Sequence, residues 1–191
     1  MAQLISTLFI TADNIPEIDF AWHMPYFDEH MSRAVDEDYR TSDVLLFGRH
    51  TYDSFAGAWP EREAAGGEDA AFAKRLGDTR KVVVSHQPLE FSWRNSEQLA
   101  GELVPAVGAL KADPNVRGIL IPGSISVVHQ LLAVGLIDEL RLLVHPVAAR
   151  KGRRLFDEGE PPYHFAVIRA EVFPSGVIRV IYSPTPPPVV R

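Results

Sequence analysis

The sequence contains no cysteine, and this absence excludes a disulfide framework, a thiol nucleophile and a thiolate metal site. Positive charge is scarce, because 19 Lys and Arg residues face 25 Asp and Glu residues, giving a formal charge of −6 with the seven histidines neutral. Nucleic-acid binding needs a clustered basic face, so this balance argues against it. No apolar run approaches the roughly 20 residues of a membrane span, and the N-terminus lacks the pattern of a signal peptide. We therefore expect a cytoplasmic protein whose partner is a small molecule, with no nucleic-acid or membrane partner.

Hydrophobic residues make up 46% of the 191 residues, which is enough to build the core of one large domain. Five apolar, β-branched runs are bounded by breakers or polar clusters, at Leu4 to Ile10, Val44 to Gly48, Lys81 to Ser85, Gly118 to Pro122 and Leu140 to His145. Three of them (VLLF, KVVVS and GILIP) are continuous rather than alternating, which is typical of strands buried on both faces.

Segments with helical character separate these runs, at Met24 to Arg40, Ala70 to Leu76, Glu102 to Lys111 and Ser124 to Val134. Strand alternating with helix predicts an α/β fold in which a mainly parallel central sheet carries helices on both faces. We expect a single domain over residues 1–183, with Ala64 to Asp69 as its main internal loop.

The last third of the chain has a different pattern. Phe165 to Phe173 and Val177 to Tyr182 are alternating strands joined by a short Pro-Ser-Gly segment, which predicts a C-terminal antiparallel hairpin at one edge of the sheet. Four of the 15 prolines then fall between Pro184 and Pro188. We expect residues 184–191 to form an extended Pro-rich tail that does not continue the sheet.

Gly48, Arg49 and Thr51 follow directly on the buried run VLLF. A glycine at a strand end lets a ligand come close, and a helix that begins there directs free N–H groups and its positive dipole end at an anion. The Arg49 guanidinium adds a planar set of donors suited to phosphate, and Thr51 adds a hydroxyl. A phosphate site is one interpretation, and a helix capped by Thr51 with a solvated Arg49 is the other.

Ser85, His86 and Gln87 form the exit of a second buried strand. In open α/β sheets ligands lie outside the carboxyl ends of the strands, so these groups would face the same crevice as Arg49. The alternative is an ordinary polar turn closed by Pro88.

The run GILIP leads through Gly123 into a helix that begins near Ser124. A glycine and a serine at the start of a helix form a small nest of N–H groups, which suits a diphosphate. The segment matches neither the G-x-G-x-x-G fingerprint nor a Walker loop. It also lacks the last glycine of G-x-S-x-G, which weakens an interpretation as a serine hydrolase.

Taken in order, the segments GRHTYDSF, RKVVVSHQP, ILIPGSISVVHQLLAVGLIDELRLLVHPV and RRLF resemble the dihydrofolate reductase-like superfamily. They are nearer to its branch with the reductase domain of the bifunctional riboflavin-biosynthesis enzyme, and the resemblance covers most of residues 4–156. It implies a three-layer α/β fold of dihydrofolate reductase type, NADPH as the cofactor, and hydride transfer to a flat pterin- or pyrimidine-like ring. It also implies a homodimer, for which the apolar strand LRLLVHPV offers a surface.

The resemblance assigns the phosphates of NADPH to the three strand exits. Gly48, Arg49 and Thr51 would serve the adenosine phosphates, with Arg49 near the 2′-phosphate. Ser85 would flank that phosphate, with His86 or Gln87 as a helper. The backbone cradle for the pyrophosphate would come from Gly123, Ser124, Ile125 and Ser126.

Two departures from the family pattern bear on this cradle. Pro122-Gly123 replaces the usual paired glycines, and proline removes an N–H donor. Arg150-Lys151-Gly152 replaces a glycine-x-glycine sequence and adds charge.

The proton donor and the substrate contacts have the weakest sequence signals. Asp13, at the exit of the first strand, is the candidate for a substrate anchor or for the catalytic acid, a role that a carboxyl with a raised pKa can fill. Trp22 and Tyr52 are the aromatic candidates for stacking on a planar substrate. The histidines at positions 23 and 30 lack the spacing of a zinc motif, so no metal is expected.

Two functions are therefore considered. The first is an NADPH-dependent reductase of a small heteroaromatic substrate, resembling a riboflavin precursor. The second is a non-catalytic module that holds a nucleotide or a flavin-like ligand on the same fold, which Pro122, Arg150 and the lack of a clear acid favour.

Overall fold

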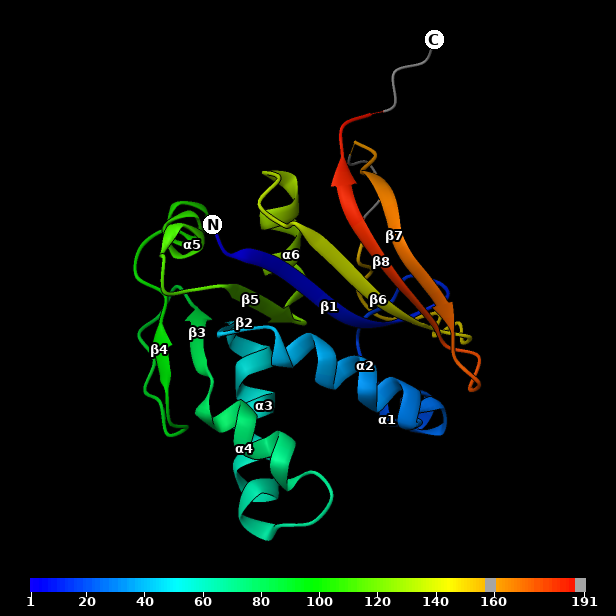
Figure 1. The fold of residues 1–191 in the computed structure, drawn as a ribbon, viewed down its shortest axis with the longest axis horizontal. Helices are drawn as coiled ribbons and strands as arrows, with labels where there is room; N and C mark the ends of the chain where they lie inside the picture. Colours follow the sequence, from blue (N-terminus) through cyan, green and yellow to red (C-terminus); the bar gives the residue numbers. More distant parts are fainter. Residues whose placement is uncertain (157–160, 188–191) are drawn as a thin grey trace.

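The computed structural model describes residues 1–156 and 161–187. An eight-stranded sheet runs through these residues in the order β4-β3-β2-β5-β1-β6-β8-β7, with β4 and β7 at its two edges (Figure 1). The strands are β1 (Gln3–Thr11), β2 (Val44–Gly48), β3 (Arg80–Val84), β4 (Ser96–Gln98), β5 (Gly118–Pro122), β6 (Glu139–His145), β7 (His164–Val172) and β8 (Ile178–Thr185). The helices are α1 (Phe20–His23), the 3-10 turn η1 (Met24–Tyr26), α2 (Glu29–Arg40), α3 (Arg49–Ala65), α4 (Ala70–Asp78), α5 (Leu103–Ala112) and α6 (Ile125–Ala133).

The strands from β4 to β6 are parallel, and β8 and β7 join them in antiparallel pairing. A parallel sheet is stable when both faces are covered, and both are covered in this molecule. On one face, Val107 of α5 and Val128 of α6 pack against the sheet. On the other, Ala34 of α2, Tyr52 of α3 and Leu76 of α4 lie in the core. The predicted three-layer α/β arrangement and its C-terminal hairpin are confirmed.

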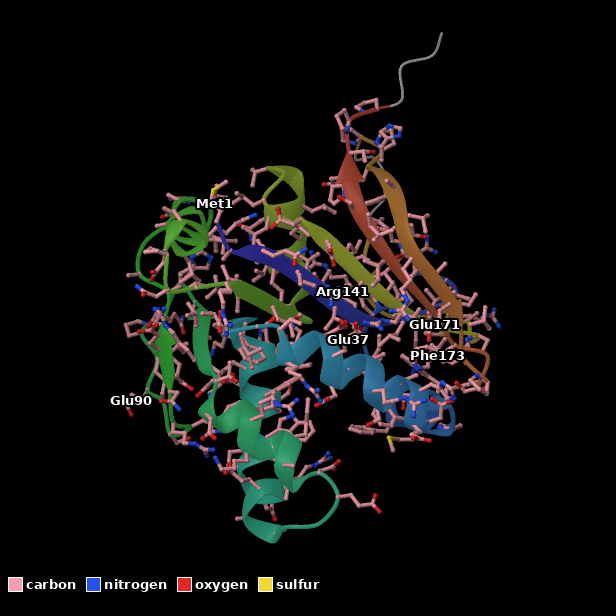
Figure 2. All side chains as sticks on the ribbon, viewed as in Figure 1. Met1, Glu37, Glu90, Arg141, Glu171 and Phe173 are labelled. Carbon is pink, nitrogen blue, oxygen red and sulfur yellow. The ribbon has the colours of Figure 1, made fainter. Side chains whose placement is uncertain are left out.

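A buried ion network fixes α2 on the sheet. Asp38, which is 1% exposed, accepts hydrogen bonds from Thr7 Oγ1 on β1 at 2.8 Å, from Arg141 Nη1 on β6 at 2.6 Å and from Arg179 Nη2 on β8 at 2.7 Å. Glu37, beside Arg141 in Figure 2, accepts from Arg179 Nη1 at 2.7 Å. Because a buried charge is tolerated only when it is paired, these contacts fix which face of α2 meets the sheet.

The predicted limits of β2 and β5 are confirmed to the residue, but the single helix predicted over Met24 to Arg40 is wrong. Met24–Tyr26 form a 3-10 turn, and Phe27 is extended. Asp28 then begins a new helix, because its carboxylate accepts a hydrogen bond from the Met31 amide at 2.9 Å. The short elements α1 and β4 were not predicted, since four and three residues are too few to show a hydrophobic period.

The predicted start of the Pro-rich tail is also wrong. β8 continues to Thr185, and Pro184 pairs with Phe165 of β7. The pairing of β8 with β6 stops at Tyr182, so one side of β8 is open beyond that point, and proline is tolerated where a strand has an open side. The predicted tail residues 188–191 lie outside the described part of the chain.

The surface predicted for dimerisation is not available. β6, which holds the LRLLVHPV strand, lies between β1 and β8, and Leu140, Leu142, Leu143 and His145 are buried within this chain. The exposed apolar residues of this region lie instead on the edge strand β7, where Val167 is 61%, Ile168 59% and Val172 71% exposed.

Candidate functional site

The loops that follow β2 and β5 are hydrogen-bonded to each other at the carboxyl edge of the sheet. The Gly48 amide donates to Ser124 Oγ at 2.7 Å, and the Ser124 hydroxyl donates to Thr51 Oγ1 at 2.9 Å. A Cβ atom at Gly48 would lie 3.2 Å from Ser124 Cβ, so the glycine allows this close approach. The helix α3 begins directly after Gly48, which caps it without a side-chain hydrogen bond, so the alternative interpretation of a helix capped by Thr51 is wrong.

The turn into α6 has left-handed backbone at two successive positions, Gly123 with φ 104° and Ser124 with φ 64°. Such a turn directs neighbouring amides to one side, and the amides of Ile125 and Ser126 belong to the first turn of α6, whose N–H groups have no partner inside the helix. Pro122 is the last residue of β5 and pairs with Thr7, so its missing donor lies in the strand, before this turn. The cradle proposed from the sequence is therefore compatible with proline at position 122.

Arg49, on the first turn of α3, lies beside the exit of β3. Its Nη1 donates to Gln87 Oε1 at 3.1 Å, and its Nε lies 3.6 Å from Asp53 Oδ2. The turn after β3 is closed by Ser85, whose hydroxyl donates to the Gln87 carbonyl at 2.9 Å. His86 is exposed in this turn. The structure thus brings together the three strand exits, and the guanidinium of Arg49 remains half-exposed at their edge.

These residues fit the phosphates of a dinucleotide. Two helix N-termini, α3 and α6, lie next to each other, and a half-exposed guanidinium stands at their rim. A Cβ atom at Gly123 would lie 3.2 Å from Thr51 Cγ2, so both glycines of the site stand where loops approach closely.

Asp13 does not fit the role of a catalytic acid. Its Oδ1 accepts hydrogen bonds from Thr11 Oγ1 at 2.6 Å and from the Ala149 amide at 3.0 Å, while its Oδ2 accepts from the Arg150 amide at 2.7 Å. These donors, with the Thr11 hydroxyl first, lower the pKa of Asp13 to about 2. A carboxyl that is ionised at neutral pH has no proton to give, so the prediction of an acid is corrected. The carboxylate ties the exit of β1 to the loop after β6.

The two predicted stacking residues have different surroundings. Tyr52 is only 4% exposed, and its ring packs against Phe47, Phe91 and Trp93 in the core under α3, so its prediction as a substrate contact is wrong. Sequence reasoning failed there because the weakly patterned helix α3 does not show which of its sides is buried. Trp22 is half-buried in α1, at the carboxyl ends of β1 and β6, and stays a candidate.

A pair of histidines beside Trp22 was not assigned to the site from the sequence. His23 Nδ1 lies 3.1 Å from His145 Nε2, and both residues are buried. The ring of Phe9 on β1 lies 4.5 Å from that of His23. No sequence signal links two histidines that are 122 residues apart, because they meet where α1 lies over Phe9 of β1, next to the end of β6.

In the described residues, no group of three His, Asp or Glu side chains is arranged to hold a metal ion. Among the same residues, no helix is both long and apolar enough to cross a membrane.

Comparisons with known proteins agree with this architecture. Residues 4–179 match the model of the RibD C-terminal domain, and the chain belongs to that family. It is 26% identical over 140 residues to the uncharacterised protein YyaP of Bacillus subtilis (strain 168), a match that covers 73% of each protein.

Two solved structures show the same fold. One is a candidate riboflavin biosynthesis protein of Shewanella sp. PV-4, with a TM-score of 0.75 and 21% identity over 97% of this chain and 100% of the other. The other is a pyrimidine reductase-like protein of Corynebacterium diphtheriae, with a TM-score of 0.66 and 15% identity over 97% of this chain and 93% of the other. The fold is therefore the dihydrofolate reductase-like fold of the RibD reductase domain, as the resemblance implied.

Proposed function

We propose that this protein is an NADPH-dependent reductase that transfers hydride to a small pyrimidine- or pterin-like substrate. The observation that carries the proposal is the junction of α3 and α6, where the Gly48 amide and the Ser124 hydroxyl join two helix N-termini beside Arg49. Membership of the RibD C-terminal family supports it, because reductases of that family typically use NAD(P)H.

Each part of this edge has a role in holding the cofactor. The amides at 123–126 and the positive end of the α6 dipole would bind the pyrophosphate. Arg49 would bind the 2′-phosphate, because its Nη1 and Nε contact the exposed Gln87 and Asp53 and can be shared with an anion. When bound, NADPH would supply the hydride, and the chain would supply orientation and electrostatics.

The substrate would lie at the carboxyl ends of β1 and β6. β5 stops beside Thr7, whereas β1 continues beside β6 to Thr11, so within the described part of the chain the last four residues of β1 have no strand on their β5 side. Four residues of strand span about 13 Å. Of these four residues Phe9 is half-buried and the others are buried, so the substrate would lie on the Phe9 side, where Trp22 stands at the strand ends.

A thermal-shift titration with NADPH, NADH and flavin mononucleotide tests the cofactor. At 100 times its dissociation constant, a one-site ligand stabilises the folded state by about 2.7 kcal/mol, a rise of roughly 5 to 10 °C for a chain of this size. We expect a selective rise with NADPH, followed by steady NADPH oxidation with a member of a pterin and aminopyrimidine panel. A rise with neither nicotinamide cofactor would contradict the proposal.

The second candidate is a binding module without turnover. The observation that favours it is the ionised state of Asp13, which leaves no carboxylic acid at the end of β1. A rise in melting temperature with flavin mononucleotide alone, and no NADPH oxidation above the rate without substrate, would support this module.

We further propose that the protein is a cytoplasmic homodimer formed through β7. An edge strand offers unpaired backbone groups to a second copy. If two copies of β7 pair antiparallel about Ala170, Arg169 of each lies opposite Glu171 of the other, and Ile168 lies opposite Val172. Glu171 lies on the open edge of the molecule in Figure 2.

A further inference from the structure

His23 and His145 form a buried hydrogen-bonded pair at the carboxyl ends of β1 and β6. His145 ends β6 and pairs with Thr11, while His23 ends α1 and covers the ring of Phe9. His23 is 5% exposed and His145 is fully buried. The ring of Trp22 lies 4.9 Å from that of His145 and 6.0 Å from that of His23. The pair therefore lies directly beside the half-buried tryptophan.

We assign the protons of the ring nitrogens from the Leu143 carbonyl and from the contact within the pair, and the Ile10 backbone also hydrogen-bonds His145. His145 Nδ1 lies 3.0 Å from the Leu143 carbonyl, which only accepts, so this nitrogen carries a proton. In a neutral ring the Nε2 of His145 is then bare, and it accepts from His23 Nδ1 at 3.1 Å. His23 Nδ1 therefore carries a proton, and His23 Nε2 is left with a bare lone pair.

Both rings are neutral at physiological pH. Burial, together with the neighbouring His145, lowers the pKa of His23 to about 4, and burial also lowers the pKa of His145. Among the described residues, His23 Nε2 has no hydrogen-bonding partner. His23 as a residue is buried, but its Nε2 still reaches solvent, so this oriented lone pair can accept from a donor that approaches from outside the chain.

The surroundings of His23 are apolar and open to solvent. Phe20 is 67% exposed, Met24 53% and Phe27 41%, and all three come from the segment that carries His23. The Phe27 ring lies 5.5 Å from that of His23. Apolar side chains around one oriented polar group are typical of a site for a planar, mostly apolar ligand with a few polar atoms.

We propose that His23 Nε2 accepts a hydrogen bond from a ring N–H or amino group of the substrate, and that His145 is the positioning residue that holds His23 in the accepting tautomer. This inference deepens the proposed reductase function and rests on it. The inference predicts a class of substrate, planar heterocycles with an N–H donor on the edge that faces α1. Such a ring would contact Trp22 through its face or edge and His23 through its N–H group.

The tautomers are tested on the unmodified protein by a long-range proton–nitrogen NMR correlation of histidine labelled with ¹⁵N. At neutral pH we expect a protonated Nδ1 and a bare Nε2 for both His23 and His145, assigned from the spectra of His23→Gln and His145→Gln. Replacement of His145 by phenylalanine should remove the fixed tautomer of His23. A protonated Nε2 on His23 would overturn the inference.

Ligand recognition is tested with uracil, which has two ring N–H donors, against 1,3-dimethyluracil, which has none, each with NADPH present. We expect uracil alone to shift the His23 Nε2 signal. Its affinity should fall about 2- to 12-fold in His23→Phe, the value of one neutral hydrogen bond. The matched control is His164→Phe, on the half-exposed start of β7, which should bind uracil like the parent protein.

Equal responses to the two pyrimidines, or no response to either, would count against the role of His23. The NADPH thermal shift, measured on the same samples, separates this result from a failure of the proposed function. If NADPH still stabilises the protein while His23 does not respond, only the inference about His23 is lost.

Discussion

The Gly48 amide and the Ser124 side chain join two neighbouring strands of the sheet through a hydrogen bond of 2.7 Å. Ser124 has left-handed backbone, a conformation that non-glycine residues seldom adopt, and its hydroxyl donates onward to Thr51. The cost of the left-handed backbone at Ser124 is offset because its hydroxyl makes hydrogen bonds with both Gly48 and Thr51. This contact sets the distance between the N-termini of α3 and α6, on which the proposed cofactor site depends.

Ser124→Ala should therefore destabilise the protein and weaken NADPH binding. The substitution leaves the partly buried N–H of Gly48 without its acceptor, which costs up to about 1 to 3 kcal/mol. Ser124→Gly loses the same hydroxyl but relieves the left-handed backbone, so it should be less destabilised than Ser124→Ala. Urea unfolding and NADPH titration of both variants, with exposed Ser54→Ala as the control, measure this order. An unchanged affinity in Ser124→Ala would show that the junction does not shape the site.

Arg49→Ala should weaken NADPH more than NADH, because only NADPH carries the 2′-phosphate. A charge-assisted hydrogen bond is worth about 1.5 to 3 kcal/mol, which corresponds to about 10- to 150-fold in affinity. The control is Arg33→Ala, which removes an exposed arginine paired with Glu29 on α2. Titration of the variant with each cofactor measures the two affinities. Equal losses of affinity for NADPH and NADH would place Arg49 away from the 2′-phosphate.

Sequence patterns predict best where one physical requirement dominates. The limits of β2 and β5 were predictable because a strand buried on both faces needs an unbroken apolar run. The strand exits that carry Arg49 and Ser124 followed from the same pattern, since parallel strands end at one edge of the sheet. Their mutual contact was not predictable, because it depends on how close two loops come.

The roles of individual side chains were harder to predict because they depend on partners far away in the chain. Asp13 has the position of an acid, but the Thr11 hydroxyl, together with amides 136 and 137 residues further on, lowers its pKa and holds it ionised. Tyr52 has the chemistry of a stacking residue, but α3 turns it into the core. The His23–His145 pair forms because α1 lies over the end of β1, which pairs with β6.

Tyr52→Phe should leave turnover unchanged and keep or raise stability. Among the described residues the buried Tyr52 hydroxyl has no hydrogen-bond partner, so the folded state carries the cost of its desolvation. Its removal keeps the ring contacts with Phe47 and Trp93 and should raise the free energy of unfolding by up to about 2 kcal/mol. Calorimetry and NADPH oxidation measure the two effects. A loss of turnover at unchanged stability would restore Tyr52 as a substrate contact.

Stability should fall as the pH falls from about 6.5 to about 4. In this window the unfolded chain protonates His23 at its usual pKa of 6.5, whereas the folded chain, with a pKa of about 4, does not. Above pH 6.5 the ring is neutral in both states and contributes nothing, and below pH 4 the penalty reaches its full value, on the order of 3 kcal/mol. His23→Gln should reduce the slope of stability against pH. Part of the slope should remain, because burial also lowers the pKa of His145. Urea unfolding at pH 7 and pH 4.5 makes the comparison, with His164→Gln as a control that should keep the parent slope.

The charges of Arg169 and Glu171 on β7 allow a charge-swap test of the proposed dimer: one substitution should weaken it, and a second should restore it. Arg169→Glu places like charges opposite each other twice across the twofold axis at Ala170, and this should raise the dissociation constant of the dimer by on the order of tenfold. Adding Glu171→Arg to the same chain exchanges both charges and should restore the dimer. Light scattering against the 21.2 kDa mass of one chain reports the outcome, with exposed Arg33→Glu on α2 as the control. A parent protein that stays at the mass of one chain, or a double variant that is no more dimeric than Arg169→Glu, would rule out pairing through β7.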